Sequence, residues 1–116
     1  MIHEEKVLDE NQWKIEAQAI INDVKNHVQD ISISQKLQST NSKIYLNLTT
    51  LEDDKYCVKV SSAGFTVASD HHDTITNTQT EAEVFETPYG LLDSISPKYR
   101  ESFGNDLINK LNNLNN

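Results

Sequence analysis

The chain has 116 residues, which is enough for one domain with a modest core and too few for two. Its net charge of −8, with no cluster of Lys and Arg, argues against nucleic acid and anionic membrane surfaces as partners. The single cysteine, Cys57, excludes an intramolecular disulfide and fits a reducing compartment.

The first predicted element is a helix over residues 11–29. Residues 1–10 are charged and aperiodic, so we expect them to form a flexible leader, with Asp9 or Asn11 available as the helix N-cap. The apolar positions of the helix recur at three- and four-residue spacing and form a stripe of about 100°. They are Trp13, Ala17, Ile20, Ile21, Val24 and Val28.

The apolar period then changes from 3.6 to 2, which is typical of strands. Four short alternating runs, at about 31–38, 44–49, 56–60 and 65–68, are separated by polar turns. In the third run Val58 faces one way and Cys57 the other, toward the polar face. The pattern predicts an antiparallel meander that is apolar on one face and solvated on the other.

A polar stretch and a short helical turn come next. Residues 69–80 are rich in Asp, Thr and Asn and are expected to form a mobile loop, while 81–86 is read as a short extended piece or the start of a turn. Residues 87–95 predict a helical turn that packs through Leu91, Leu92 and Ile95.

The last predicted element is a long helix that begins with Ser96 as cap and Pro97 at the first position, and runs to Leu114. A stripe of about 120° contains its main apolar residues, with Ile108 about 60° beyond it. The stripe residues are Tyr99, Phe103, Leu107, Leu111 and Leu114. We expect Tyr99 and Phe103 to anchor the helix on the sheet, and the end beyond Leu107 to be less covered. The alternative is that all five are buried alike.

The predicted fold class is therefore α+β. One domain over residues 11–114, with a frayed tail at 115–116, combines the N-terminal helix, the four-stranded meander, the helical turn and the long C-terminal helix. Both long helices are expected on the apolar face of the sheet. The residues expected to be largely buried are Trp13, Ile20, Val24, Leu46, Val58, Val67 and Phe103.

The sequence offers little for catalysis. His71 and His72 are ligand-type residues, but adjacent side chains point apart and no second pair matches them. The alternatives for this segment are a solvated loop and a metal-assisted enzyme built on these histidines, and the pattern favours the loop. Cys57 lacks a neighbouring base and is expected to be an inert thiol. We therefore expect no enzyme activity, no cofactor and no metal site.

A run near the C-terminus carries a family resemblance: Tyr89-x-Leu91-Leu92-Asp93-x-x-Ser96-Pro97-x-Tyr99-Arg100-Glu101-x-Phe103-Gly104-Asn105-x-Leu107. It resembles the hallmark of the glycogen synthase kinase 3 beta interaction protein family, and the likeness extends over residues 13–114. A related domain occurs in the large clustered-mitochondria proteins. The resemblance implies a small adaptor and kinase regulator in Wnt signalling, located in the cytoplasm and also the nucleus.

The family's C-terminal helix binds the kinase and is similar to the kinase-binding helix of axin. The resemblance therefore implies kinase-binding roles for Phe103, Leu107, Ile108, Leu111 and Leu114. The alternative is a structural domain of the clustered-mitochondria type, in which the last helix is wholly core.

A second partner of some family members is the regulatory-subunit dimer of protein kinase A, which grips the N-terminal helix. The resemblance places that contact at Ile21 and at position 25, which here is Lys25. An ammonium in a dry groove is costly, so we expect no such anchoring. The chain is also expected to be monomeric, with no nucleic acid or membrane partner.

Overall fold

The computed structural model describes residues 9–76 and 83–114, and these form an α+β fold. The elements in chain order are α1 (Glu10–Val24), the 3-10 turn η1 (Lys25–His27), β1 (Asp30–Ile33), β2 (Lys43–Thr49), β3 (Lys55–Ser61), β4 (Gly64–Ser69), α2 (Pro88–Ile95) and α3 (Pro97–Leu114). The strands pair antiparallel in the order β1-β2-β3-β4, which confirms the predicted meander. Most of the expected leader lies outside the described residues.

The first helix begins one residue earlier than predicted and ends sooner. Asp9 is the N-cap: its carboxylate accepts from the Gln12 backbone N–H at 2.8 Å, and the Gln12 side chain accepts from the Asp9 N–H at 3.1 Å. α1 ends at Val24 and continues as η1 before β1. The Trp13 indole N–H donates to the Asn41 carbonyl at 3.0 Å, so it fixes the helix to the turn before β2.

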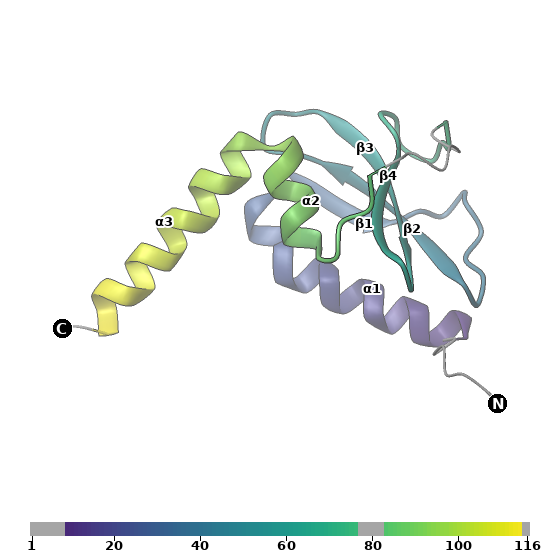
Figure 1. The fold of residues 1–116 in the computed structure, drawn as a ribbon, viewed down its shortest axis with the longest axis horizontal. Coiled ribbons are helices and arrows are strands. Elements are labelled where there is room, and N and C mark those ends of the chain that lie inside the picture. Colours follow the sequence, from purple (N-terminus) through teal and green to yellow (C-terminus); the bar gives the residue numbers. More distant parts are fainter. Residues whose placement is uncertain (1–8, 77–82, 115–116) are drawn as a thin grey trace.

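One face of the sheet carries the main core, covered by α1 and α2 (Figure 1). Of the expected core residues, Trp13, Val24, Leu46 and Val58 are buried, and Ile20 and Val67 are partly buried against them. α2 is capped by Thr87 and buries Leu91 and Leu92, with Ile95 partly buried beside them, as predicted. Phe103 is not in this core, and its expected burial is wrong.

The second face of the sheet is not simply solvated, as the alternation had predicted. Tyr45, Cys57 and Ala68 form a smaller buried cluster there, with Leu37 packed against it. β1 ends at Ile33 because the Ser34 hydroxyl accepts from the Leu37 backbone N–H at 3.1 Å, and this turn removes Leu37 from the strand.

The segment after β4 covers that second face over its described part. The Asp73 carboxylate accepts from the Asn47 amide at 2.8 Å, and the Asp73 backbone N–H donates to the Asn47 side-chain oxygen at 2.8 Å. The Thr76 N–H donates to the Ala68 carbonyl at 2.8 Å. The expected mobile loop is thus held against the sheet over 70–76, and residues 77–80 lie outside the described part.

The approach to α2 is also fixed to the sheet. Phe85 and Phe65 exchange two backbone hydrogen bonds of 2.8 Å, which agrees with the extended piece expected before the helical turn. Gly64 makes this pairing possible: its φ is +133°, and a Cβ there would lie 2.4 Å from the Phe85 carbonyl oxygen.

α3 is the largest departure from the expected packing. It runs away from the sheet rather than along it, and its packing partners are α2 and η1 (Figure 1). The physical reason is that α1 and α2 already cover the apolar face, and a hydrogen-bonded joint at Ser96 sets the direction in which α3 leaves.

Candidate functional site

The joint that directs α3 consists of Ser96 and Glu52. The Ser96 hydroxyl caps α3 by accepting from the Tyr99 backbone N–H at 3.0 Å, and it donates to Glu52 Oε1 at 2.7 Å. The second carboxylate oxygen of Glu52 accepts from the Lys98 N–H at 2.8 Å. Burial alone would raise the pKa of Glu52, but these hydrogen bonds outweigh it and hold the pKa below its ordinary value.

The first two turns of α3 pack through an aromatic group. Tyr99 is 3% exposed, and burial raises its pKa to about 12. The His27 ring meets Tyr99 at 6.0 Å and Phe103 at 5.4 Å between ring centroids. His27 Nδ1 also lies 2.9 Å from the Ser102 hydroxyl oxygen. These contacts fix the start of α3. Tyr99 is buried as expected, but it packs against η1 rather than anchoring the helix on the sheet, and Phe103 does not anchor it there either.

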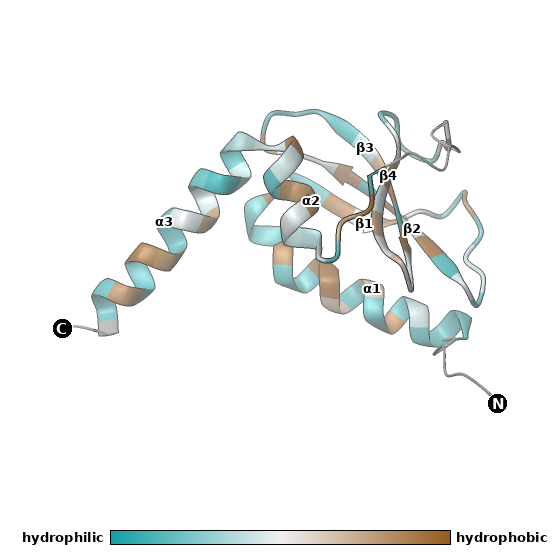
Figure 2. Cartoon of the chain, viewed as in Figure 1, coloured by the Kyte–Doolittle hydropathy of each residue, from teal (hydrophilic) through white to brown (hydrophobic). Residues whose placement is uncertain are grey.

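Beyond this point the apolar residues of α3 are exposed, and we call Phe103, Leu107, Ile108 and Leu111 the α3 face. Their exposed fractions are 40%, 50%, 55% and 51%. Figure 2 shows the hydrophobic segments along the outer half of α3, where the helix projects from the domain. The alternative that all five stripe residues are buried alike is therefore wrong. The alternative of a structural domain whose last helix lies wholly in the core is wrong for the same reason. The side chain of Leu114 is outside the described part of the structure.

Helix geometry explains the change from buried to exposed. At about 100° per residue, Leu107, Leu111 and Ile108 lie about 40°, 80° and 140° around the axis from Phe103, whereas Tyr99 lies about 40° in the opposite direction. Each step along the stripe therefore rotates the apolar side chains away from His27. The face that continues past Phe103 points into solvent.

Four large exposed apolar side chains on one helix are unusual for a surface. Burying such a side chain fully contributes about 1.5–3 kcal/mol to stability relative to full exposure, and the fold leaves about half of that contribution unused at each position. Contiguous apolar patches of this kind mark binding surfaces. Within the α3 face, Leu107 follows Phe103 by four residues, and Leu111 follows Leu107 by four and Ile108 by three. Anchors at three- and four-residue spacing are typical of a helix that binds in a partner's groove.

Tyr89 extends the α3 face onto α2, and sequence reasoning missed it. Its ring lies 6.0 Å from that of Phe103 at an interplanar angle of 48°, and 38% of the residue is exposed. Burial and the neighbouring Asp23 carboxylate raise its pKa. Its position in α2, about 160° around the helix from the buried Leu91, could have indicated an exposed aromatic ring.

Two ion pairs of α3 are exposed on both sides. Lys110 Nζ is 3.6 Å from the Asp106 carboxylate, and Arg100 Nε is 2.9 Å from that of Asp93. Exposed pairs of this kind contribute little to stability. They leave the apolar side chains of the α3 face open to a partner.

The two histidines considered as metal ligands bind different partners. His71 Nδ1 lies 2.8 Å from Asp70 Oδ1 in an exposed pair, whereas His72 Nε2 donates to the Leu48 carbonyl at 3.0 Å. Within residues 9–76 and 83–114, no three His, Cys, Asp or Glu side chains are grouped as metal ligands would be. Cys57 is buried, and burial raises the pKa of its thiol, which disfavours the reactive thiolate.

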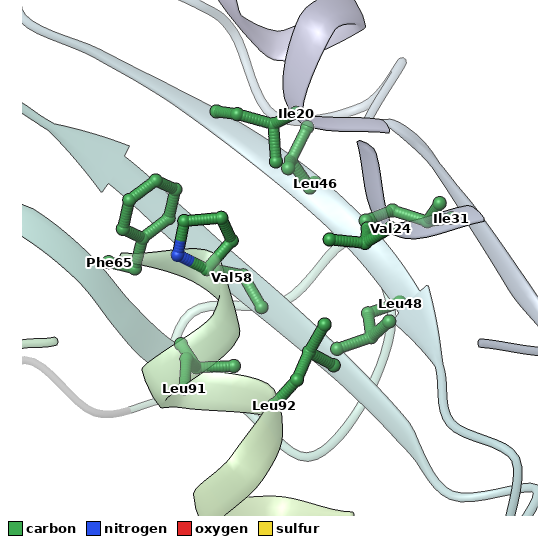
Figure 3. A pocket seen from close by; sticks show the side chains of 10 residues that line it. Ile20, Val24, Ile31, Leu46, Leu48, Val58, Phe65, Leu91 and Leu92 are labelled. Atoms are coloured by element: carbon green, nitrogen blue, oxygen red, sulfur yellow. The ribbon is translucent and has the colours of Figure 1, made fainter. Parts of the chain in front are cut away.

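A small pocket between α1, α2 and the sheet is lined by apolar residues (Figure 3). They are Ile20, Val24, Ile31, Leu46, Leu48, Val58, Phe65, Pro88, Leu91 and Leu92. Ligand sites combine an apolar lining with a few polar groups that orient the ligand, and this lining has none. We therefore interpret the pocket as imperfect core packing.

Ile21 of α1 is buried in the core and Lys25, at the start of η1, is exposed, while nothing in the structure explains the exposure of Ile15. No helix in the described part of the chain is long and apolar enough to cross a membrane.

Comparison with known proteins gives a consistent family match. Residues 13–114 match the model of the GSKIP domain. The chain is 40% identical over 101 residues to a Danio rerio protein named GSK3-beta interaction protein, covering 87% of this chain and 75% of the relative. It is 35% identical over 106 residues to the Homo sapiens GSK3B-interacting protein, covering 91% and 76%. A Drosophila melanogaster protein, named Protein GSKIP homolog, is 30% identical over 99 residues, covering 83% of each chain.

Proposed function

The chain belongs to the GSKIP domain family, and we propose that it is a non-enzymatic adaptor that binds glycogen synthase kinase 3 through its last helix. The names of its relatives, which describe interaction with this kinase, support the choice of partner. The binding residues that we assign are Phe103, Leu107, Ile108, Leu111 and Leu114.

The observation that carries this proposal is the exposure of the α3 face on a helix whose start is fixed. The joint between Ser96 and Glu52, together with the buried Tyr99 ring, orients α3 before any partner binds. A preorganised helix loses less conformational entropy on binding than a disordered segment would. The apolar side chains are therefore available for contact without any opening of the core.

We further propose that the adaptor modulates the kinase by occupying a helix-binding groove. Phe103, Leu107, Ile108 and Leu111 follow the axin-like pattern, so an axin-type helix would use the same groove. Two helices cannot occupy one groove together. We therefore expect a peptide with the axin-like pattern to displace this protein from the kinase in a competition assay.

A truncation tests the proposed function directly. A chain that ends at Gly104 keeps Ser96, Tyr99 and Phe103 but loses the outer part of α3. In a pull-down with glycogen synthase kinase 3, we expect the full chain to retain the kinase and the truncated chain to lose it. Thermal unfolding of the truncated chain should remain cooperative, because the buried contacts of α3 are retained. Kinase retention by the truncated chain would contradict the proposal.

A further inference from the structure

Gly104, which has no side chain, lies among the apolar residues of the α3 face. At about 100° per residue, Gly104 lies about 100° around the helix from Phe103, between Leu111 at about 80° and Ile108 at about 140°. Leu107 and Ile108 follow it by three and four residues, so they are its direct neighbours on the helix surface. A position without a side chain thus lies in the middle of the exposed apolar residues.

Nothing in the described part of the chain requires glycine at this position. A Cβ added to Gly104 would meet no atom within 4 Å, and Gly104 lies inside the regular helix Pro97–Leu114. The contrast is Gly64, whose positive φ and close approach to Phe85 exclude a side chain. Glycine is also the poorest helix former after proline, so it weakens α3 without an internal benefit.

We propose that Gly104 is the point of closest approach between α3 and glycogen synthase kinase 3, an inference that rests on the proposed function. Without a Cβ, the helix backbone can come close to the wall of the kinase groove. That approach brings Leu107 and Ile108 into contact on either side of the same wall. A large side chain at position 104 would keep the helix at a greater distance from the groove wall. The contacts of Leu107 and Ile108 with the kinase would then weaken together, while the fold of the domain would be unchanged.

The test compares Gly104→Ala and Gly104→Leu in the full chain, with Asn109→Leu as a matched control. Asn109 is exposed and lies about 170° around the helix from the middle of the α3 face, so it adds the same side chain on the far side. Kinase affinity is measured by calorimetry, and helix content by far-UV circular dichroism. We expect Gly104→Leu to lose at least about tenfold in affinity, Gly104→Ala to lose less than Gly104→Leu but more than the control, and Asn109→Leu to stay within about threefold of the parent protein.

Helical signal should be maintained or increased in both Gly104 variants, because alanine and leucine are better helix formers than glycine. Parent-like affinity of Gly104→Leu would overturn the proposal, and so would a loss of affinity accompanied by a loss of helical signal. Leu107→Ala separates this failure from failure of the proposed function. If Leu107→Ala weakens binding and Gly104→Leu does not, the kinase-binding surface is correct and the close approach is wrong. If neither variant weakens binding, both are wrong.

Discussion

The hydroxyl oxygen of Ser102 lies 2.9 Å from Nδ1 of His27, although the two residues are 75 positions apart in the chain. This hydrogen bond joins η1 to the second turn of α3, just before the helix leaves the domain. Together with the rings of Tyr99 and Phe103 around His27, it divides α3 into a packed start and an exposed outer part. Substitutions in the packed start should therefore lower the stability of the domain, whereas substitutions in the exposed outer part should change kinase binding and leave stability nearly unchanged.

Tyr99→Ala should lower the free energy of unfolding by about 3–5 kcal/mol, because a large buried ring is replaced by a cavity. Leu107→Ala, which removes an exposed side chain from the same helix, should change it by less than about 0.5 kcal/mol. Urea denaturation followed by circular dichroism measures both values. Equal destabilisation by the two variants would show that α3 packs along its whole length.

Glu52 predicts a specific dependence of stability on pH. Its folded-state pKa is lowered, so its contribution to stability is complete above the unfolded-state pKa of about 4.3 and is lost as pH falls through the folded-state value. We therefore expect Glu52→Gln to lower the melting temperature at pH 7, and the difference from the parent protein to shrink below about pH 4.3. Glu16→Gln, at an exposed position of α1, controls for the change in net charge. A difference for Glu52→Gln that persists unchanged at pH 3 would contradict the hydrogen-bonded role of this carboxylate.

The structure gives a second reason to expect no anchoring of protein kinase A. Ile21, one of the two positions implied by the family resemblance, is buried in the core, and the other is the charged Lys25. A regulatory subunit would have to open the core and also desolvate an ammonium group. Titration of the full chain with a regulatory-subunit dimer should show no binding up to tens of micromolar. Micromolar binding would refute this prediction, and Lys25→Leu should raise the affinity if position 25 is the contact.

Leu111→Pro tests whether the helical form of the outer part of α3 is required. Proline inside a helix costs about 3 kcal/mol or more, because it removes a backbone hydrogen bond and clashes with the preceding turn. We expect the outer helix to unfold locally and kinase binding to be lost, while the melting temperature of the domain changes little. Lys110→Ala, at an exposed neighbouring position, serves as the control. Kinase binding by Leu111→Pro would mean that a helix is not what the partner recognises.

The sequence predicted the elements of this fold well because each one depends on local chemistry. Alternation in residues such as Leu46 and Val58 identified the strands, and the pair Ser96-Pro97 identified the start of α3. The direction of α3 was not predictable in the same way. A helical stripe gives the angular positions of Tyr99 and Phe103 around the helix axis. It does not show that α1 and α2 already cover the apolar face of the sheet, which leaves no place there for α3.

The second face of the sheet was misjudged for a related reason. Alternation indicated that Cys57 faces away from the main core, and it does. The segment that covers it is polar, and it is held there by hydrogen bonds between Asp73 and Asn47, which are 26 residues apart. Such long-range polar pairing leaves no periodic signal in the sequence.

Ile108→Ala is the most direct test of the claim that the exposed face of α3 binds glycogen synthase kinase 3. Ile108 is 55% exposed, so its truncation should leave the melting temperature within about 1 °C of the parent value. Its loss from a groove contact should weaken kinase binding by at least about 1 kcal/mol, or about fivefold. Calorimetric titration of the kinase and a thermal melt on the same preparation give both numbers, with Asn109→Ala as the control. A fall in melting temperature with unchanged kinase affinity would contradict the account.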